Sequence, residues 1–214
     1  MFDMDGLMFD TERIGRDGWH KAAETLHIDL PEEIITAMRG TGTDRCREIF
    51  NAAIPGNLYD IAHDLRLRYA DEVIAADGVP IKPGLPELLR WLKASGIPAV
   101  LATSTNRAKA LAYLQQTDVE RYFTAAVFGP EVAHPKPAPD IFRAAAAAIR
   151  ADPAHCVVLE DSPNGLQAAK AAGCPAIVVP DLTPAPAESE HLWNYHAEDL
   201  HEVQQILLKE REKL

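Results

Sequence analysis

The chain has 214 residues, which is enough for one buried α/β core with an insertion but short for two domains of ordinary size. Hydrophobic residues make up 47% and charged residues 25%, as in folded globular proteins and unlike disordered or membrane-spanning chains. The formal net charge of -11 provides no general basic surface for phosphate backbones or anionic lipid head groups. We therefore expect neither nucleic acid nor a membrane as a partner.

The cysteines and the first residues bear on the cellular compartment. Cys46, Cys156 and Cys174 are odd in number, widely separated and without the spacing of a metal finger, so we expect reduced thiols. Asp3 and Asp5 stand where a secretory signal would carry positive charge, and no apolar stretch reaches membrane-spanning length. These features predict a cytoplasmic protein.

The first third of the chain predicts a helical insertion into a core. Residues 1–4 have the apolar character of a strand fragment. The patterns that follow have helical periodicity and include no persuasive strand; they cover residues 12–26, 31–38, 44–53 and 58–76. The core would begin at residue 1 and resume near Val79. We predict a core domain over residues 1–9 and 80–214, with a helical cap domain over residues 10–79.

From about residue 80, short apolar runs alternate with helical segments, which is the pattern of βα units around a parallel sheet. The expected helices cover residues 85–95, 107–116, 140–149, 162–173 and a C-terminal segment from Asp199, and the expected strands cover 98–102, 126–128, 156–159 and 176–179. This order predicts an α/β fold: a Rossmann-like, doubly wound parallel sheet core with an inserted α-helical cap domain.

Polar residues follow four of the expected strands. In an open parallel sheet, the loops at the carboxyl ends of the strands converge on one crevice, where ligands bind. We therefore expect these side chains to lie close together: Asp3, Asp5, Thr103, Ser104, Lys136, Glu160 and Asp161.

The charges of this set indicate a metal and a phosphate. Four carboxylates against one lysine repel one another unless a cation joins them. Oxygen ligands without histidine or cysteine select a hard cation, and Mg²⁺ commonly combines carboxylates with water and a substrate phosphate. Thr103, the amide of Ser104 and Lys136 supply donors suited to the oxygens of a phosphoryl group.

Four motifs in the core resemble the haloacid dehalogenase superfamily. They are FDMDG at residues 2–6, LATS at 101–104, HPKPAPDIF at 134–142 and VLEDSPNGLQAAKAAG at 158–173, in the order of that superfamily. The resemblance covers nearly the whole core, whereas the cap matches only in position and helical character. Within the superfamily, the chain is similar to the branch of phosphatases and β-phosphoglucomutases that carry a helical cap after the first motif.

The resemblance implies a role for each residue. Asp3 would attack the phosphorus and form an aspartyl-phosphate, while Asp5 would protonate the leaving oxygen and then activate water. Mg²⁺ would be held by Asp3, the backbone carbonyl of Asp5, Asp161 and Glu160, the last directly or through water. The phosphate would be bound by Gly6, Thr103, Ser104 and Lys136, and Thr103 and Lys136 would also stabilise the transferring group.

Simpler interpretations exist for each feature. Glu160 and Asp161 could be charges at a helix N-terminus, and Lys136 could be an ordinary exposed loop lysine. Thr103 and Ser104 could form a turn before the next helix. In the cap, the locally basic loop with Arg39 and Arg45 could contact the far end of a substrate or could be a plain connection between helices; we keep both alternatives.

The expected activity is hydrolysis of a small phosphomonoester, such as a sugar or other metabolite phosphate, by a monomer or weak dimer. The alternatives are a phosphosugar mutase and a catalytically silent binding protein. β-Phosphoglucomutases carry a histidine early in the cap, where this chain has Gly15, and a cap arginine that would fall near Thr43. Both mismatches favour hydrolysis. Because only two residues precede Asp3, fewer than a central strand usually needs, we also expect the first strand to be short.

Overall fold

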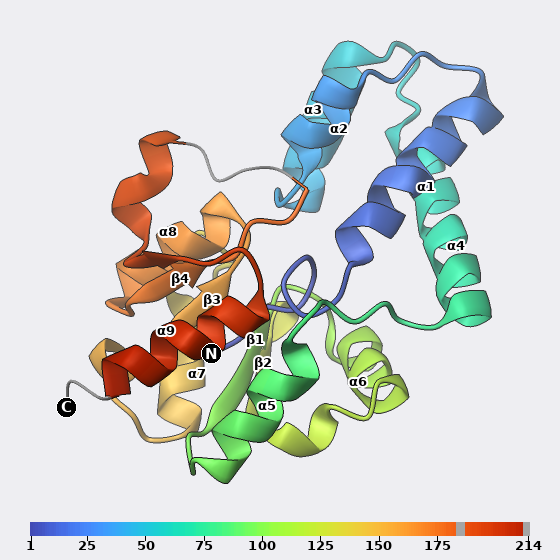
Figure 1. The fold of residues 1–214 in the computed structure, drawn as a ribbon. Coiled ribbons are helices and arrows are strands. Elements are labelled where there is room, and N and C mark those ends of the chain that lie inside the picture. The colour runs from blue at the N-terminus through green and yellow to red at the C-terminus, as the bar shows by residue number, and fades with distance from the viewer. Residues whose placement is uncertain (183–186, 212–214) are drawn as a thin grey trace. The chain divides into compact units, whose positions relative to one another are not determined.

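The structure is a computed structural model that describes residues 1–182 and 187–211. The chain divides into two compact units, one formed by Met1–Asp10 and Ile81–Leu214, the other by Thr11–Pro80. We call them the core unit and the helical unit and describe each by itself. In Figure 1 the helical unit is drawn in blue to blue-green.

The core unit is built on parallel strands. They are β1 (Ala99–Thr103), β2 (Phe123–Phe128), β3 (Val158–Glu160), β4 (Ala176–Val178) and β5 (Tyr195–His196). β1 pairs with β2, and β4 pairs with both β3 and β5, always in parallel. Phe2 joins the two groups, because it forms parallel bridges to Leu101 and to Leu159.

The resulting order is β2, β1, the segment at Phe2, β3, β4 and β5, which confirms the predicted doubly wound parallel sheet. Some strands differ from expectation. The strand fragment predicted over residues 1–4 is reduced to the bridges of Phe2, and β2 begins at Phe123, earlier than expected. β5 was not predicted, since its two residues are exposed and make no apolar run.

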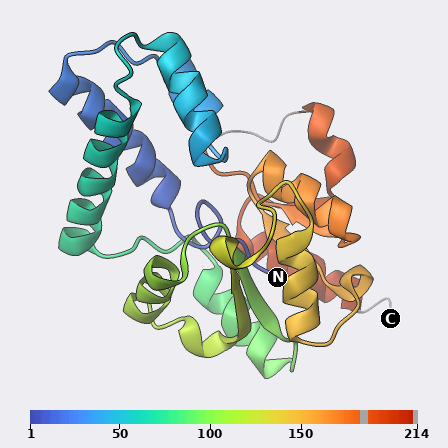
Figure 2. The ribbon, with the colours of Figure 1, turned by 180° about the vertical axis from the view of Figure 1, so that it is seen from behind.

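Helices cover both faces of this sheet. They are α5 (Leu85–Ala94), α6 (Arg107–Gln116), α7 (Asp140–Ala148), α8 (Pro163–Ala172) and α9 (Leu200–Arg211), with 3₁₀ turns at Glu120–Tyr122, Gly129–Glu131, Pro153–His155 and Ala187–Leu192. Figure 1 shows α5 and α9 in front of the strands, and the reverse view in Figure 2 brings α7 to the front.

Side-chain patterning explains how α7 packs. Ile141, Phe142, Ala145 and Ala146 recur at helical spacing and are buried against β1, β2 and α8. Complete burial of a side chain such as Phe142 contributes about 2–3 kcal/mol of hydrophobic free energy. Ala145 and Ala146, from the run of alanines in this helix, therefore belong to its buried face.

The helical unit consists of α1 (Thr11–Leu26), α2 (Glu32–Met38), α3 (Thr43–Ala53) and α4 (Tyr59–Asp77). It has a hydrophobic cluster of its own, in which Trp19 and Tyr59 pack on the fully buried Phe50 with ring centroids 5.7 and 5.8 Å away. α1 and α4 pack along each other. Within the described ranges, no helix has both the length and the apolarity needed to cross a membrane.

Candidate active site

Asp3 is placed by the sheet itself. The amide and carbonyl of Phe2 bond to β1 through Val100 O and Ala102 N, both at 2.8 Å. The amide of Asp3 then donates to Leu159 O at 3.1 Å on the other side. Because the backbone is held between β1 and β3, the Asp3 side chain emerges at the carboxyl edge of the sheet, where it is 11% exposed.

Lys136 reaches this edge from the loop before α7. Its ammonium group donates to Asp3 Oδ1 at 2.5 Å, to Glu160 Oε1 at 2.6 Å and to the carbonyl of Ala102 at 3.2 Å. Its side chain is only 7% exposed. The structure therefore contradicts the alternative of an ordinary exposed loop lysine, since all three donors of the ammonium group have acceptors.

Burial sets the protonation of this pair. Desolvation, with the nearby charges of Glu160 and Asp5, raises the pKa of Asp3 to about 7, although Lys136 acts in the opposite direction. Burial by itself lowers the pKa of Lys136, but the carboxylates of Asp3 and Glu160 outweigh that effect and raise it above its ordinary value. Lys136 therefore stays a cation at neutral pH. Its single positive charge does not bring the pKa of Asp3 back to the ordinary value of an aspartate.

Glu160 supports the lysine from the end of β3. It is fully buried, and its second oxygen, Oε2, accepts hydrogen bonds from the amide of Ser162 at 3.0 Å and from the Ser162 hydroxyl at 2.9 Å. Ser162 also caps α8 by accepting from the amide of Gly165. A Cβ at Gly165 would stand 1.7 Å from Glu160 Oε1, so only glycine allows the carboxylate to lie against the first turn of α8.

Asp3, Glu160 and Asp161 each offer a carboxylate oxygen, and these oxygens lie within 4.8 Å of one another. The set consists only of oxygens and is mostly buried, which fits a hard divalent cation rather than a softer metal. Three of the four carboxylates expected from the sequence have this geometry. Asp5 was expected to contribute its backbone carbonyl, and that role stays a prediction.

The carboxylate of Asp5 has a different partner. Its Oδ2 accepts a hydrogen bond from the Thr105 hydroxyl at 2.6 Å, and the amide of Thr105 donates to Thr103 Oγ1 at 3.1 Å. Thr103 is buried, whereas Ser104 between them is exposed. Thr105 was not predicted, although it lies two residues after Thr103, the last residue of β1.

Gly6 is required by the shape of the first loop. Its φ is +83°, and a Cβ there would stand 2.3 Å from Asp161 Oδ2. A side chain would therefore meet both backbone strain and a carboxylate. The close approach brings the loop after Asp5 next to the end of β3.

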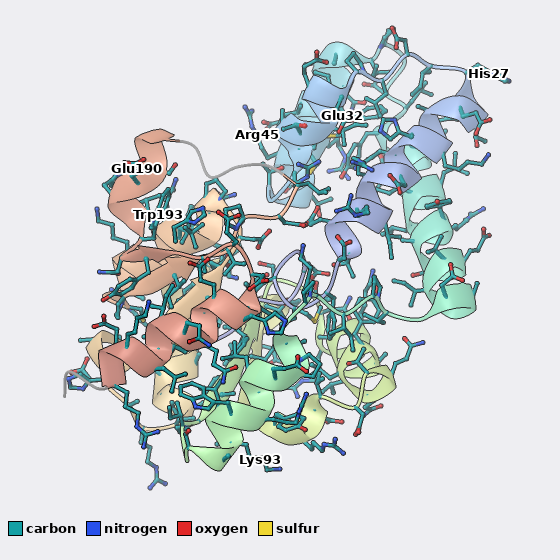
Figure 3. All side chains as sticks on the ribbon, viewed as in Figure 1. His27, Glu32, Arg45, Lys93, Glu190 and Trp193 are labelled. Atoms are coloured by element: carbon teal, nitrogen blue, oxygen red, sulfur yellow. The ribbon has the colours of Figure 1, made fainter. Side chains whose placement is uncertain are left out.

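The two arginines predicted to touch substrate lie in the helical unit. Arg39 Nε is 3.9 Å from Glu12 Oε2, and Arg45, on α3 as labelled in Figure 3, pairs with Glu48 at 2.8 Å. Both ion pairs are formed within the helical unit, and the Arg45 pair is exposed. Their contact with a substrate stays a prediction.

Comparisons with known proteins agree with this site. Residues 1–173 match the model of the haloacid dehalogenase-like hydrolase family. The chain is 31% identical over 175 residues to a phosphorylated carbohydrates phosphatase of Thermotoga maritima, covering 81% of this chain and 80% of the relative. It is 32% identical to the fructose-1-phosphate phosphatase YqaB of Escherichia coli, covering 84% and 94%.

Among solved structures, the fold is similar to a CbbY mutant of Rhodobacter sphaeroides in complex with xylulose-(1,5)bisphosphate. The TM-score is 0.75 at 26% identity, over 94% of this chain and 93% of the other. The match of the family model extends from the first motif to the end of α8 and includes every core-unit residue of the candidate site described above. The chain therefore belongs to the haloacid dehalogenase-like hydrolase family.

Proposed function

We propose that the chain is a Mg²⁺-dependent phosphatase that hydrolyses a phosphorylated carbohydrate or a similar small phosphomonoester. The observation that carries this proposal is the buried carboxylate of Asp3, which shares one site with the cation of Lys136 and the acidic groups of Glu160 and Asp161. A nucleophile, a phosphate-binding cation and oxygen ligands for a metal are the groups that phosphoryl transfer requires.

In the first half-reaction, a carboxylate oxygen of Asp3 attacks the phosphorus and the ester bond breaks, giving an aspartyl-phosphate. Asp5 donates a proton to the departing alcohol oxygen, and Thr105 orients the Asp5 carboxylate through its hydroxyl. In the second, Asp5 takes a proton from water as the water attacks the phosphorus, which restores Asp3 and releases inorganic phosphate. The ammonium group of Lys136 stabilises the phosphoryl oxygens.

The metal has its own supporting argument. Asp3 and Asp161, with Glu160 directly or through water and the Asp5 carbonyl, would hold Mg²⁺, which when bound neutralises charge on the transferring group. Glu160 Oε1 and Oε2 already accept hydrogen bonds from Lys136 and Ser162, so we favour the role through water for this residue.

The substrate class rests on the relatives. One acts on phosphorylated carbohydrates, a second on fructose 1-phosphate, and the CbbY structure holds a sugar bisphosphate. We propose that the helical unit serves as the cap that selects the leaving group, with Arg39 and Arg45 as candidates for its contacts. Cytoplasmic location and a monomeric or weakly dimeric state stay predictions.

A mutase is the second candidate, and the surroundings of Gly15 speak against it. The Arg66 guanidinium lies over Gly15: a Cβ there would stand 2.6 Å from Arg66 Nη2, and Arg66 Nε donates to the Gly15 carbonyl. The position at which mutases carry a histidine therefore has no space for a side chain unless Arg66 moves. Without that cap contact, an aspartyl-phosphate is less protected from water.

The proposal is tested by phosphate release from a panel that includes fructose 1-phosphate, xylulose 1,5-bisphosphate and β-glucose 1-phosphate, with Mg²⁺ or with chelator. We expect release that requires the metal and is lost in Asp3→Asn and Asp5→Asn, while Asp118→Asn at the exposed surface keeps it. Conversion of the glucose ester to its 6-phosphate without phosphate release would establish the mutase instead. Absence of both activities in a folded sample would refute the enzyme.

A further inference from the structure

A second buried ion pair lies beside the site. Lys82 Nζ donates to Asp181 Oδ1, and the two side chains are 19% and 4% exposed. Asp181 lies in the loop after β4, and Glu160 and Asp161 lie at the end of β3. Because both strands are parallel, all three residues stand at the same carboxyl edge of the sheet. The backbone amide of Lys82 donates to Met8 O at 2.9 Å, which fixes the lysine against the loop that follows Asp5.

The other oxygen of Asp181 is unusual. Oδ2 is buried and accepts no hydrogen bond from any described residue. A buried charged oxygen without a donor loses its hydration and gains nothing in return, so native proteins seldom leave one without a partner. A partner outside the chain, such as a bound water or an ion, would remove this cost.

This oxygen lies close to one of the candidate metal ligands. Asp181 Oδ2 lies 3.3 Å from the point where a Cβ on Gly6 would stand, and Asp161 Oδ2 lies 2.3 Å from the same point. Both carboxylate oxygens therefore flank the first loop from the side of the candidate metal ligands. Among the residues that the structure describes, however, the group close enough to share one ion consists of Asp3, Glu160 and Asp161, without Asp181.

We propose that Asp181 is a positioning residue of the metal centre, whose Oδ2 accepts a hydrogen bond from a water bound to the divalent cation. The inference rests on the proposed function. Mg²⁺ keeps several waters when proteins bind it, and carboxylates that hold such waters contribute to metal affinity. Lys82 pairs with the first oxygen of Asp181, which leaves the second oxygen available to such a water.

The test is Mn²⁺ binding, measured by the electron paramagnetic resonance signal of free Mn²⁺ on titration into the folded full-length chain. Asp181→Asn keeps an acceptor for Lys82 but places an amide donor where Oδ2 stands. We expect its Kd for Mn²⁺ to rise about tenfold or more, as for other residues that hold metal-bound groups. Asp118→Asn is the matched control, because it removes one carboxylate from an exposed position, and it should bind as the wild type does.

Two further variants distinguish the effect of Asp181 Oδ2 on metal affinity from the effect of the Lys82–Asp181 ion pair. In Lys82→Gln the side-chain amide can still donate to Oδ1, so we expect Mn²⁺ affinity close to that of the wild type. Asp181→Asn alone leaves the Lys82 charge buried without its partner and could fold poorly for that reason. The double variant Lys82→Gln/Asp181→Asn removes both charges of the pair, and we expect it to show the same tenfold loss of Mn²⁺ affinity.

Wild-type affinity in Asp181→Asn or in the double variant would overturn the inference, and so would an equal loss in Lys82→Gln. If the wild-type protein itself bound no Mn²⁺ and released no phosphate, the proposed function would fail with it. Metal-dependent phosphate release by the wild type, together with unchanged Mn²⁺ affinity in Asp181→Asn, would remove only the role of Asp181.

Discussion

Replacement of Lys136 by methionine probes the charge balance of the site in the absence of metal. The Lys136 side chain is 7% exposed, and its ammonium group contacts two carboxylates; the side chains of Asp3 and Glu160 are 11% and 0% exposed. Removing one partner of a buried ion pair costs about 3–5 kcal/mol, because the remaining charge is left uncompensated. Since burial already raises the pKa of Asp3 to about 7, Asp3 can take up a proton and relieve part of this cost. We expect a loss near the lower limit, about 3 kcal/mol.

The assay is urea denaturation at neutral pH, in chelator and in Mg²⁺. Lys209→Met on the exposed side of α9 is the matched control, because it removes the same charge without buried partners. In Mg²⁺ the deficit of Lys136→Met should shrink, since the metal supplies the positive charge that the lysine provided, and its metal affinity should rise. A loss no larger than that of Lys209→Met, or a deficit that Mg²⁺ leaves unchanged, would refute the reasoning.

Further predictions follow from single contacts. Thr105→Val removes the donor to Asp5, so we expect kcat for phosphate release to fall about tenfold, with Thr105→Ser restoring it. Gly6→Ala places a Cβ against Asp161, so calorimetry should show weakened Mg²⁺ binding. Burial lowers the pKa of His63 from its ordinary value of 6.5, so protonation favours the unfolded state. Thermal melts should therefore show a stability that falls as the pH drops below 6.5. The fall should be smaller in His63→Gln, which has no group to protonate.

Local signals predicted most of the core helices well. α6 begins and ends where the sequence indicated, because Asn106 caps it by accepting from Lys109, and the pattern changes at Thr117. Short strands were harder, since they depend on partners that periodicity does not reveal. Phe2 pairs at a single position with each neighbour, and Tyr195 and His196 form a strand only through pairing with β4.

The sequence predicted which residue types meet at the sheet edge but not how they pair. Placement after strands was enough to select Asp3, Lys136 and Glu160 as neighbours. It could not show that both oxygens of Glu160 receive hydrogen bonds, nor that Thr105 holds Asp5, because those contacts depend on loop conformation. Asp181 follows a predicted strand as well, and the same rule extended to β4 would have found it.

The carboxylates of the site need more positive charge than its lysines provide. At the carboxyl edge, the described residues bring together five carboxylates but only two ammonium groups, and both ammonium groups are already engaged. Lys136 contacts Asp3 and Glu160, and Lys82 contacts Asp181. The five carboxylates are those of Asp3, Asp5, Glu160, Asp161 and Asp181. The N-terminus of α8 offsets part of the remaining negative charge through its dipole. A divalent cation would balance the rest and still leave Lys136 to meet the incoming phosphate. The excess of carboxylates therefore lowers the stability of the metal-free site and, for the same reason, provides its affinity for metal.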